Sequence, residues 1–213
     1  MEKFDVIVVF DTEFVSSKRG SQPFQVSMSA YQLNGEKLVE FGKFSIFITL
    51  KSGLFLNEYV KEYTGISDTK LKNEGIYPSM AKKQLIDYLL SFNFKSTIFV
   101  GWAIANDLKM FDLLLNDEDE IFDVNLLRWV DLGSAYATFN GVEHSMIPAL
   151  KTACEKYGLK NSHYHDASGD VIATAKLLEK MISVHGMPSF LKLNESKYRK
   201  KKYKKVRENK KGT

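Results

Sequence analysis

Two carboxylates stand in a stretch that is otherwise apolar, Val8-Val9-Phe10-Asp11-Thr12-Glu13-Phe14. Its β-branched and aromatic residues indicate a buried strand, on which side chains two positions apart point to the same face. Asp11 and Glu13 are therefore expected to share one site. At a separation of about 4 Å and an effective dielectric constant near 20 they would repel by roughly 4 kcal/mol, so the pair requires a shared proton, a basic side chain or a metal cation. No basic residue follows until Lys18, which favours the cation.

Two later segments supply further polar candidates. Asp107 follows a buried stretch at residues 96–102 and lies near the start of the next expected helix, where an acid is electrostatically favoured. A simple helix N-cap is the alternative for Asp107. His165 and Asp170 lie five residues apart across the entry to another helix, and none of the other three histidines has an Asp at that offset.

These residues must be positioned by a mixed α/β fold. An antiparallel meander is predicted from strands at residues 4–10, 24–33 and 37–50, with a turn at 34–36, and a further buried strand is predicted at residues 96–102. Helices are expected at residues 57–63, 80–91, 105–116, 144–158 and 166–184. A meander followed by alternating helix and strand indicates a mixed sheet with helices on its faces.

The composition favours one globular domain with a charged end. The chain has 213 residues, of which 44% are hydrophobic, and we predict one domain at residues 1–190 and a basic, disordered tail at 191–213. Residues 197–211 hold ten Lys or Arg and one acid, a net charge of +9, whereas the rest of the chain carries −5. Such a block is either a solvated terminus or a segment that holds phosphate backbones, with Tyr198 and Tyr203 able to stack on bases.

Other features exclude several classes. The sequence contains no apolar run of 18 residues, no basic segment before the apolar stretch at the N-terminus and no small-residue cleavage site, so no membrane span or secretory signal is expected and the location is predicted to be cytoplasmic. The single cysteine, Cys154, is expected to be buried filler. The absence of a Cys/His cluster argues against structural zinc.

The motifs together resemble the DEDDh (DnaQ-like) family of 3′→5′ exonucleases in the RNase H-like superfamily, over about residues 6–178. The chain has the Asp-x-Glu of the first motif, an Asp in "NDLKMFDLL" similar to the form found in small RNA-trimming members, a Thr-Gly-Ile segment in "YTGIS", and "HDASGDV" for the third motif. Members of the tyrosine subclass have Tyr four residues before the last Asp. Asp166 occupies that position here, so the histidine subclass fits. Gln25 departs from the family, because members often have Glu there.

The resemblance implies a mixed five-stranded RNase H-like sheet flanked by helices, and a metal-dependent exonuclease. It implies that two Mg²⁺ or Mn²⁺ ions, about 4 Å apart, bracket the scissile phosphate, and that His165 is the general base. The implied metal ligands are Asp11, Glu13, Asp107 and Asp170. Thr12 and Phe14 are predicted to contact the substrate, the 3′ end of single-stranded RNA or DNA, from which 5′-mononucleotides would be released.

Three alternatives remain at this stage. An RNase H-like endonuclease would share the acids but would have no use for His165 at this offset. A proofreading subunit would dock on a DNA polymerase, and a catalytically idle nucleic-acid-binding module would keep the fold alone. Among neighbouring residues, Asp112 is expected on the solvated surface, Trp102 in packing, and His163 and Asp166 outside the direct chemistry.

Overall fold

A computed structural model describes residues 5–116, 122–160, 165–186 and 195–196. Residues 197–213, the most basic part of the predicted tail, and His163 lie outside the described residues. Within the described part, no helix is both long enough and apolar enough to cross a membrane. The predicted cytoplasmic location stays a prediction.

The sheet is built around an antiparallel meander. Strand β1 (Val6–Ser17) pairs with β2 (Gly20–Asn34), and β2 pairs with β3 (Lys37–Ile48). All three strands are long, and β1 and β2 each extend beyond the predicted boundaries. The extension matters for β1, because it keeps the two carboxylates inside the hydrogen-bonded strand rather than in a loop after it.

Parallel strands complete the sheet on the other side of β1. Strand β5 (Thr97–Gly101) pairs with β1, and β6 (Arg128–Asp131) pairs with β5, both in parallel. The two-residue strands β4 (Gly75–Ile76) and β7 (Glu195–Ser196) close the edges, which gives the order β4-β3-β2-β1-β5-β6-β7. The predicted mixed α/β sheet with five main strands is confirmed, and the two short edge strands are additions to it.

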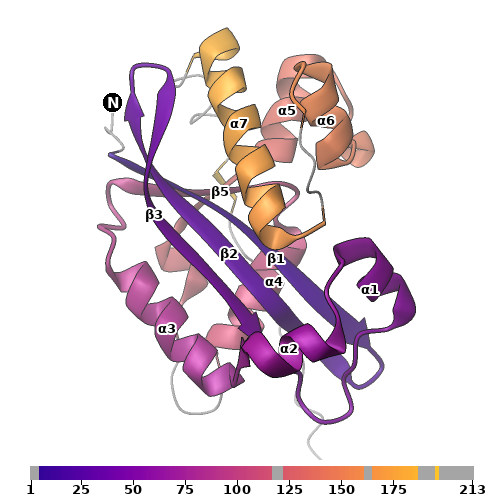
Figure 1. Ribbon diagram of the computed structural model, residues 1–213. Helices are drawn as coiled ribbons and strands as arrows, with labels where there is room; N and C mark the ends of the chain where they lie inside the picture. The colour runs from indigo at the N-terminus through magenta and orange to yellow at the C-terminus, as the bar shows by residue number, and fades with distance from the viewer. Residues whose placement is uncertain (1–4, 117–121, 161–164, 187–194, 197–213) are drawn as a thin grey trace, which may run out of the picture.

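Helices cover both faces of this sheet (Figure 1). Helices α3 and α4 pack on one face, and α5, α6 and α7 on the other, where α7 crosses β1 and β2. Helices α1 and α2 lie near the far ends of the meander strands. The bounds are α1 Glu58–Thr64, α2 Asp68–Glu74, α3 Pro78–Leu90, α4 Ala105–Leu115, α5 Leu132–Asn140, α6 Leu150–Lys156 and α7 Ala167–His185.

The side chains of β1 alternate between the two faces of the sheet, so the strand contributes to two hydrophobic cores. Ile7 and Val9 are buried with α5, α6 and α7, whereas Val8 and Phe10 are buried with α3 and α4. This alternation continues past the core, so Asp11 and Glu13 follow on the α7 face and the residue between them on the α4 face. The two-sided burial of one strand thus decides which helix meets each polar side chain.

The structure differs from the sequence-based expectations at several elements. The helix expected at 144–158 is interrupted: a 3₁₀ turn at His144–Met146 precedes α6, because Pro148 disfavours helical geometry in the residue before it. Helices α2 and α5 and the four-residue strand β6 were not predicted. Each is short enough that its hydrophobic pattern repeats too few times to be read.

The expectation that Asp112 lies on the solvated surface is wrong, because its side chain is buried at 8% exposure. Asp112 stands one helical turn beyond the buried Leu108 and therefore on the same face of α4. Asn116 donates a hydrogen bond to its carboxylate at 2.5 Å. The expectation that Cys154 is buried is confirmed.

Candidate active site

Three carboxylates meet where β1 passes beneath the first turn of α7. One oxygen from each of Asp11, Glu13 and Asp170 lies within 4.8 Å of the others. Asp170 is in the first turn of α7, whose N-cap is Asp166, which accepts a hydrogen bond from the backbone N–H of Gly169 at 3.3 Å. Asp11 and Asp170, which are 159 positions apart in the sequence, thus belong to one acidic cluster. The alternation of side chains along the strand predicted that Asp11 and Glu13 would share a site.

Asp107 reaches the same region from the opposite face of the sheet. Its Oδ1 accepts hydrogen bonds from the backbone N–H of Thr12 at 3.0 Å and from the Thr12 hydroxyl at 2.6 Å. Thr12 lies between the two cluster carboxylates on β1 and faces α4, so it fixes the carboxylate of Asp107 directly. Asp107 is not one of the three clustered residues, but it lies close enough to influence their charge.

Burial is the largest cause of a raised pKa in each of these acids, and the charges of neighbouring acids add to it. Burial, followed by the charges of Asp107, Glu13 and Asp170, raises the pKa of Asp11 well above its usual range. Burial, then Asp170 and Asp107, raises the pKa of Glu13 to about 8. Burial raises the pKa of Asp107 to about 6 against the opposing effect of its hydrogen bonds from Thr12, and burial also raises the pKa of Asp170 to about 6. The cluster therefore strongly favours a positive neighbour.

The donor set fits a hard divalent cation. Its ligands are carboxylate oxygens, the type that Mg²⁺ and Mn²⁺ prefer. Oδ1 of Asp170 is buried and has no hydrogen-bond partner among the described residues. A buried acceptor without a donor is costly, and a cation bound to the cluster would satisfy it.

His165 borders the cluster in an unusual backbone conformation. Its φ is +67°, in the left-handed region that non-glycine residues seldom adopt. Its backbone N–H donates to Oδ2 of Asp170 at 3.2 Å, and its ring stacks on Tyr63 of α1 with 3.7 Å between ring centroids. Burial, then the charge of Lys151, lowers the pKa of the His165 imidazole, which favours the neutral form that can accept a proton.

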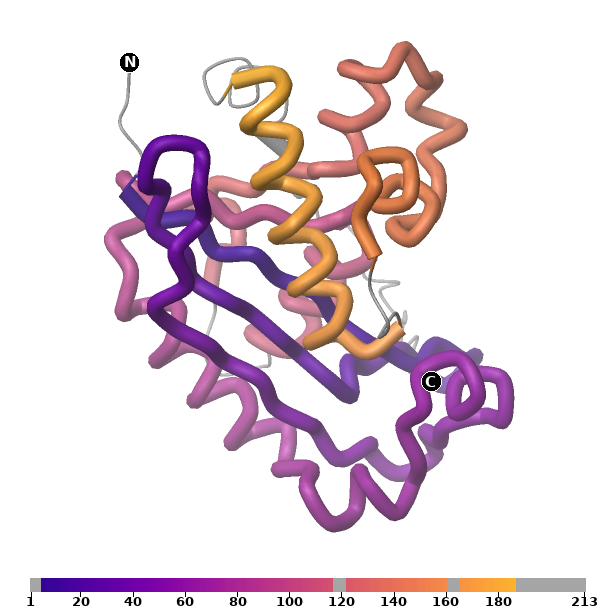
Figure 2. The backbone as a smooth tube through the Cα atoms, turned by 45° about the horizontal axis from the view of Figure 1, so that its top comes forward, coloured from indigo at the N-terminus to yellow at the C-terminus, as the bar shows by residue number. Residues whose placement is uncertain are grey.

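Gln25 of β2 fastens the N-terminus of α7 to the sheet. Its side-chain amide donates to Asp166 at 2.7 Å, and its side-chain oxygen accepts from the backbone N–H of Ala167 at 3.2 Å. Gln25 is 1% exposed. Asp166 is thus engaged as helix cap and amide acceptor, in keeping with the prediction that it lies outside the direct chemistry. Figure 2 shows how this end of α7 comes down on the sheet near α1.

Asp131 at the end of β6 positions the loop that precedes Asp107. Its Oδ1 accepts from the backbone N–H of Ala103 at 3.0 Å, and it also caps α5 through Gly133 and Ser134. Sequence reasoning missed this residue. An Asp followed by "LGSAYA" is a helix-start signal that could have revealed the cap, but nothing in the sequence links Asp131 to a loop 28 residues earlier.

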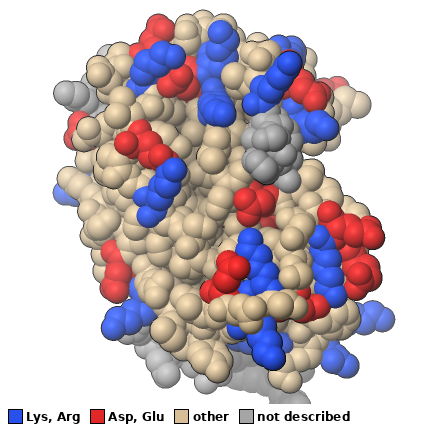
Figure 3. All heavy atoms as spheres, in the orientation of Figure 1, with Lys and Arg blue, Asp and Glu red and all other residues tan. Residues whose placement is uncertain are grey.

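The remaining predicted site residues have distinct surroundings. Phe14 follows a register shift in the pairing of β1 with β2 and is partly buried. Trp102 packs against Tyr136 and donates to the carbonyl oxygen of Pro148 at 3.2 Å, in keeping with a packing role. Figure 3 shows a notch in the outline of the molecule between the part with α5 and α6 and the part with α1, and acidic side chains lie beside it.

Solved structures of nucleases share this fold. The nuclease domain of 3′hExo, a DEDDh family member bound to rAMP, matches with a TM-score of 0.71 at 17% identity, over 92% of this chain and 98% of that one. Cell-death related nuclease 4 (CRN-4) matches with a TM-score of 0.70 at 17% identity, over 85% and 65% of the two chains. E. coli exonuclease I in complex with dT13 matches with a TM-score of 0.66 at 14% identity, over 84% of this chain and 41% of that one. The protein therefore has the fold of these nucleases.

A family model described as an exonuclease, RNase T, matches residues 8–178. The chain belongs to this exonuclease family, and the resemblance to the DEDDh exonucleases inferred from its motifs is confirmed. A sequence search of curated proteins finds no match. The chain spans about two fifths of exonuclease I and about two thirds of CRN-4.

Proposed function

We propose that the protein is a metal-dependent 3′→5′ exonuclease that removes 5′-mononucleotides from the 3′ end of single-stranded nucleic acid. The observation that carries the proposal is the convergence of Asp11, Glu13 and Asp170 beside His165. Three acids with raised pKa values and a histidine with a lowered pKa form a constellation suited to phosphodiester hydrolysis.

Each side chain has a role in this proposal. Asp11, Glu13 and Asp170 would hold Mg²⁺ or Mn²⁺. Asp107 would complete the ligand set, either after its hydrogen bonds from Thr12 have rearranged or with its carboxylate shared between Thr12 and the metal. Two bound cations would lower the pKa of the attacking water and stabilise negative charge on the scissile phosphate and the departing 3′ oxygen. His165 would accept the proton of the water at a ring nitrogen. Phe14 and Thr12 are proposed substrate contacts, and both the backbone N–H and the hydroxyl of Thr12 would first have to release Asp107.

The substrate class follows from chemistry that related nucleases display. The 3′hExo nuclease domain binds rAMP, and exonuclease I binds a dT13 oligonucleotide. A run of thymidines cannot pair with itself, so the dT13 complex supports a single-stranded substrate here. We include RNA and DNA in the proposal, because one of these related structures holds a ribonucleotide and the other a deoxyribonucleotide oligomer.

The domain division belongs to the same proposal. Residues 1–190 would form the exonuclease domain, and residues 191–213 would add a basic tail that binds phosphate backbones. Within that second range, Glu195–Ser196 pairs with β6, so the sheet takes in two residues beyond the proposed boundary. A polymerase partner and a cytoplasmic location stay predictions from the sequence.

The decisive experiment is degradation of a 5′-labelled strand with Mg²⁺ present. The wild-type protein should shorten the strand stepwise from its 3′ end, and His165→Ala and Asp11→Ala should each lose at least about 100-fold in rate. His144→Ala and Asp87→Ala are matched controls, because both side chains are exposed and lie on other elements. Internal fragments would indicate an endonuclease, and wild-type rates in both site variants would refute the assignment.

A further inference from the structure

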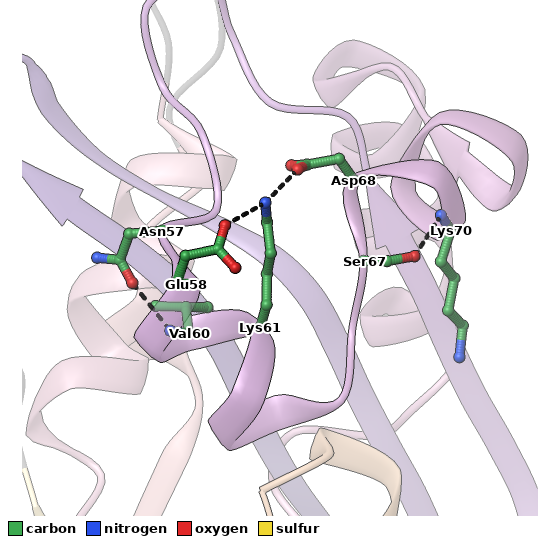
Figure 4. Close-up of polar contacts among 7 residues, drawn as sticks. All are labelled: Asn57, Glu58, Val60, Lys61, Ser67, Asp68 and Lys70. Carbon is green, nitrogen blue, oxygen red and sulfur yellow. Dashed lines mark hydrogen bonds and ion pairs between the residues drawn. The ribbon is translucent and has the colours of Figure 1, made fainter.

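Helices α1 and α2 form a braced corner next to the acidic cluster. Lys61 of α1 contacts Glu58 at 3.0 Å and Asp68 at the start of α2 at 2.7 Å, so one ammonium group spans both helices (Figure 4). Asn57 caps α1 and Ser67 caps α2, each through its side-chain oxygen. The caps fix the start of each helix, and the shared ammonium group of Lys61 links the two helices.

The corner is also attached to the strands that carry the carboxylates. Ile66, between the two helices, is 2% exposed and packs in an apolar cluster with Val15 of β1 and Phe24 of β2. The Thr64 hydroxyl donates to the carbonyl oxygen of Val60 and accepts from the backbone N–H of Ile66. The residue just before Thr64 is therefore held at a fixed position relative to β1.

That residue is Tyr63, and its ring is used in a stack rather than in the core. The Tyr63 and His165 rings are 3.7 Å apart with 27° between their planes. Tyr63 is 46% exposed, so burial in the core does not explain its orientation. Tyr59, one turn earlier on α1, stacks on Tyr63 at 5.4 Å and extends the arrangement outward.

His165 benefits from external support because its own backbone is strained. A left-handed conformation costs a non-glycine residue on the order of 1 kcal/mol and persists where the surroundings hold it. The hydrogen bond to Asp170 holds the backbone of His165, and the Tyr63 stack restrains the orientation of its ring. Burial, then Tyr59, Glu13 and Asp170, raises the pKa of the Tyr63 hydroxyl, in keeping with a ring at the border of the acidic cluster.

We propose that Tyr63 is a positioning residue that holds the His165 imidazole at the edge of the acidic cluster. The effect of this stack on catalysis rests on the proposed function, in which His165 is the base. The existence of the stack does not depend on the proposed function. The braced α1–α2 corner supplies the rigidity, and the aromatic face supplies the contact. The tyrosine hydroxyl is not required, so phenylalanine should replace tyrosine at this position.

The first test measures the stack without substrate or metal. In the full-length protein with histidine labelled for NMR, the His165 ring protons, assigned with His165→Gln, should be shifted upfield by the neighbouring ring. Tyr63→Leu should abolish this shift and Tyr63→Phe should keep it. Tyr77→Leu is the matched control, because Tyr77 is 71% exposed at the start of α3 and should leave the shift unchanged. An unshifted His165 in the wild-type protein would overturn the proposal.

The second test measures the consequence for catalysis. Tyr63→Leu should lower kcat by about 10- to 100-fold with KM within about twofold, because a small misplacement of a catalytic group is enough for such a loss. Tyr63→Phe should stay within about twofold of the wild type. In a His165→Ala background, Tyr63→Leu should cause no further loss, since a residue that acts through His165 has nothing left to position.

The outcomes separate this proposal from the proposed function. An equal loss from Tyr63→Leu in the wild-type and His165→Ala backgrounds, or a rise in KM alone, would mean that Tyr63 contacts the substrate and would overturn the positioning role. A loss in Tyr63→Phe as large as in Tyr63→Leu would do the same. If His165→Ala retained full activity, the base assignment would fail, while the NMR result would still report on the stack.

Discussion

Neutralising Glu13 should stabilise the metal-free protein at alkaline pH. Burial, then Asp170 and Asp107, raises the pKa of Glu13 from 4.5 to about 8, so the folded state holds a proton that the unfolded state releases between these values. Stability must then fall as pH rises through this window and level off above pH 8. At roughly 1.4 kcal/mol per pKa unit the loss has an upper limit of roughly 5 kcal/mol, and screening of the partly exposed carboxylate reduces it. We expect a measured loss of about 2 kcal/mol or more.

The assay is urea unfolding with EDTA at pH 5 to 8, followed by tryptophan fluorescence, since Trp129 is fully buried. Glu13→Gln should weaken the pH dependence without removing it, because Asp11, Asp107 and Asp170 also have raised pKa values, and it should be more stable than the wild type at pH 8. Saturating Mn²⁺ should stabilise the wild type at pH 8 by about 2.7 kcal/mol at 100 times its Kd, and the variant by less. Glu155→Gln, an exposed change on α6, is the control. A wild-type curve that is flat from pH 5 to 8, or equal behaviour of the two variants, would refute the electrostatic reasoning.

Three further perturbations address other parts of the molecule. Gln25→Glu would set a carboxylate against Asp166 and remove the amide donor, so it should cost about 2 kcal/mol at pH 8 and speed amide exchange at the start of α7, whereas unchanged exchange would contradict the clamp. Gly101→Ala would bring a methyl group within 3.1 Å of the carbonyl oxygen of Phe10 and should lower stability by about 1–3 kcal/mol in thermal unfolding; a neutral effect would mean that the strands separate easily there. Deleting residues 197–213 should weaken binding of long strands at low salt and leave dinucleotide cleavage unchanged, and equal affinities of both chains for long strands would count against a binding tail.

The sequence was sufficient for the parts of the site that depend on local geometry. The shared face of Asp11 and Glu13 follows from strand alternation, and the first-turn position of Asp170 follows from the helix-start pattern. The order of the three meander strands also follows, because strands joined by short turns pair with their neighbours in the sequence, whereas the place of β5 beside β1 was not predicted.

The contacts that complete the site depend on tertiary packing and could not be predicted. The hydrogen bonds from Thr12 to Asp107 depend on which helix covers the second face of β1. The stack of Tyr63 on His165 joins residues about 100 positions apart, and a single sequence carries no signal for it. The burial of Asp112 could not be predicted either, because it results from helix packing, whereas the charge of the side chain favours the surface.

The alternation along β1 has a consequence for how this site can change. Ile7 and Val9 lie on the same face of the sheet as Asp11 and Glu13. One uninterrupted alternation along the strand therefore places both the core residues and the site residues. Deleting Phe10, the one residue between Val9 and Asp11, would turn both carboxylates toward α4 and Thr12 toward α7, and it would also remove a buried aromatic side chain from the core with α3 and α4. Substitutions within the site alter one contact at a time, whereas a change in the length of this strand inverts the whole arrangement. Insertions and deletions in this part of β1 should therefore damage the active site and the core together.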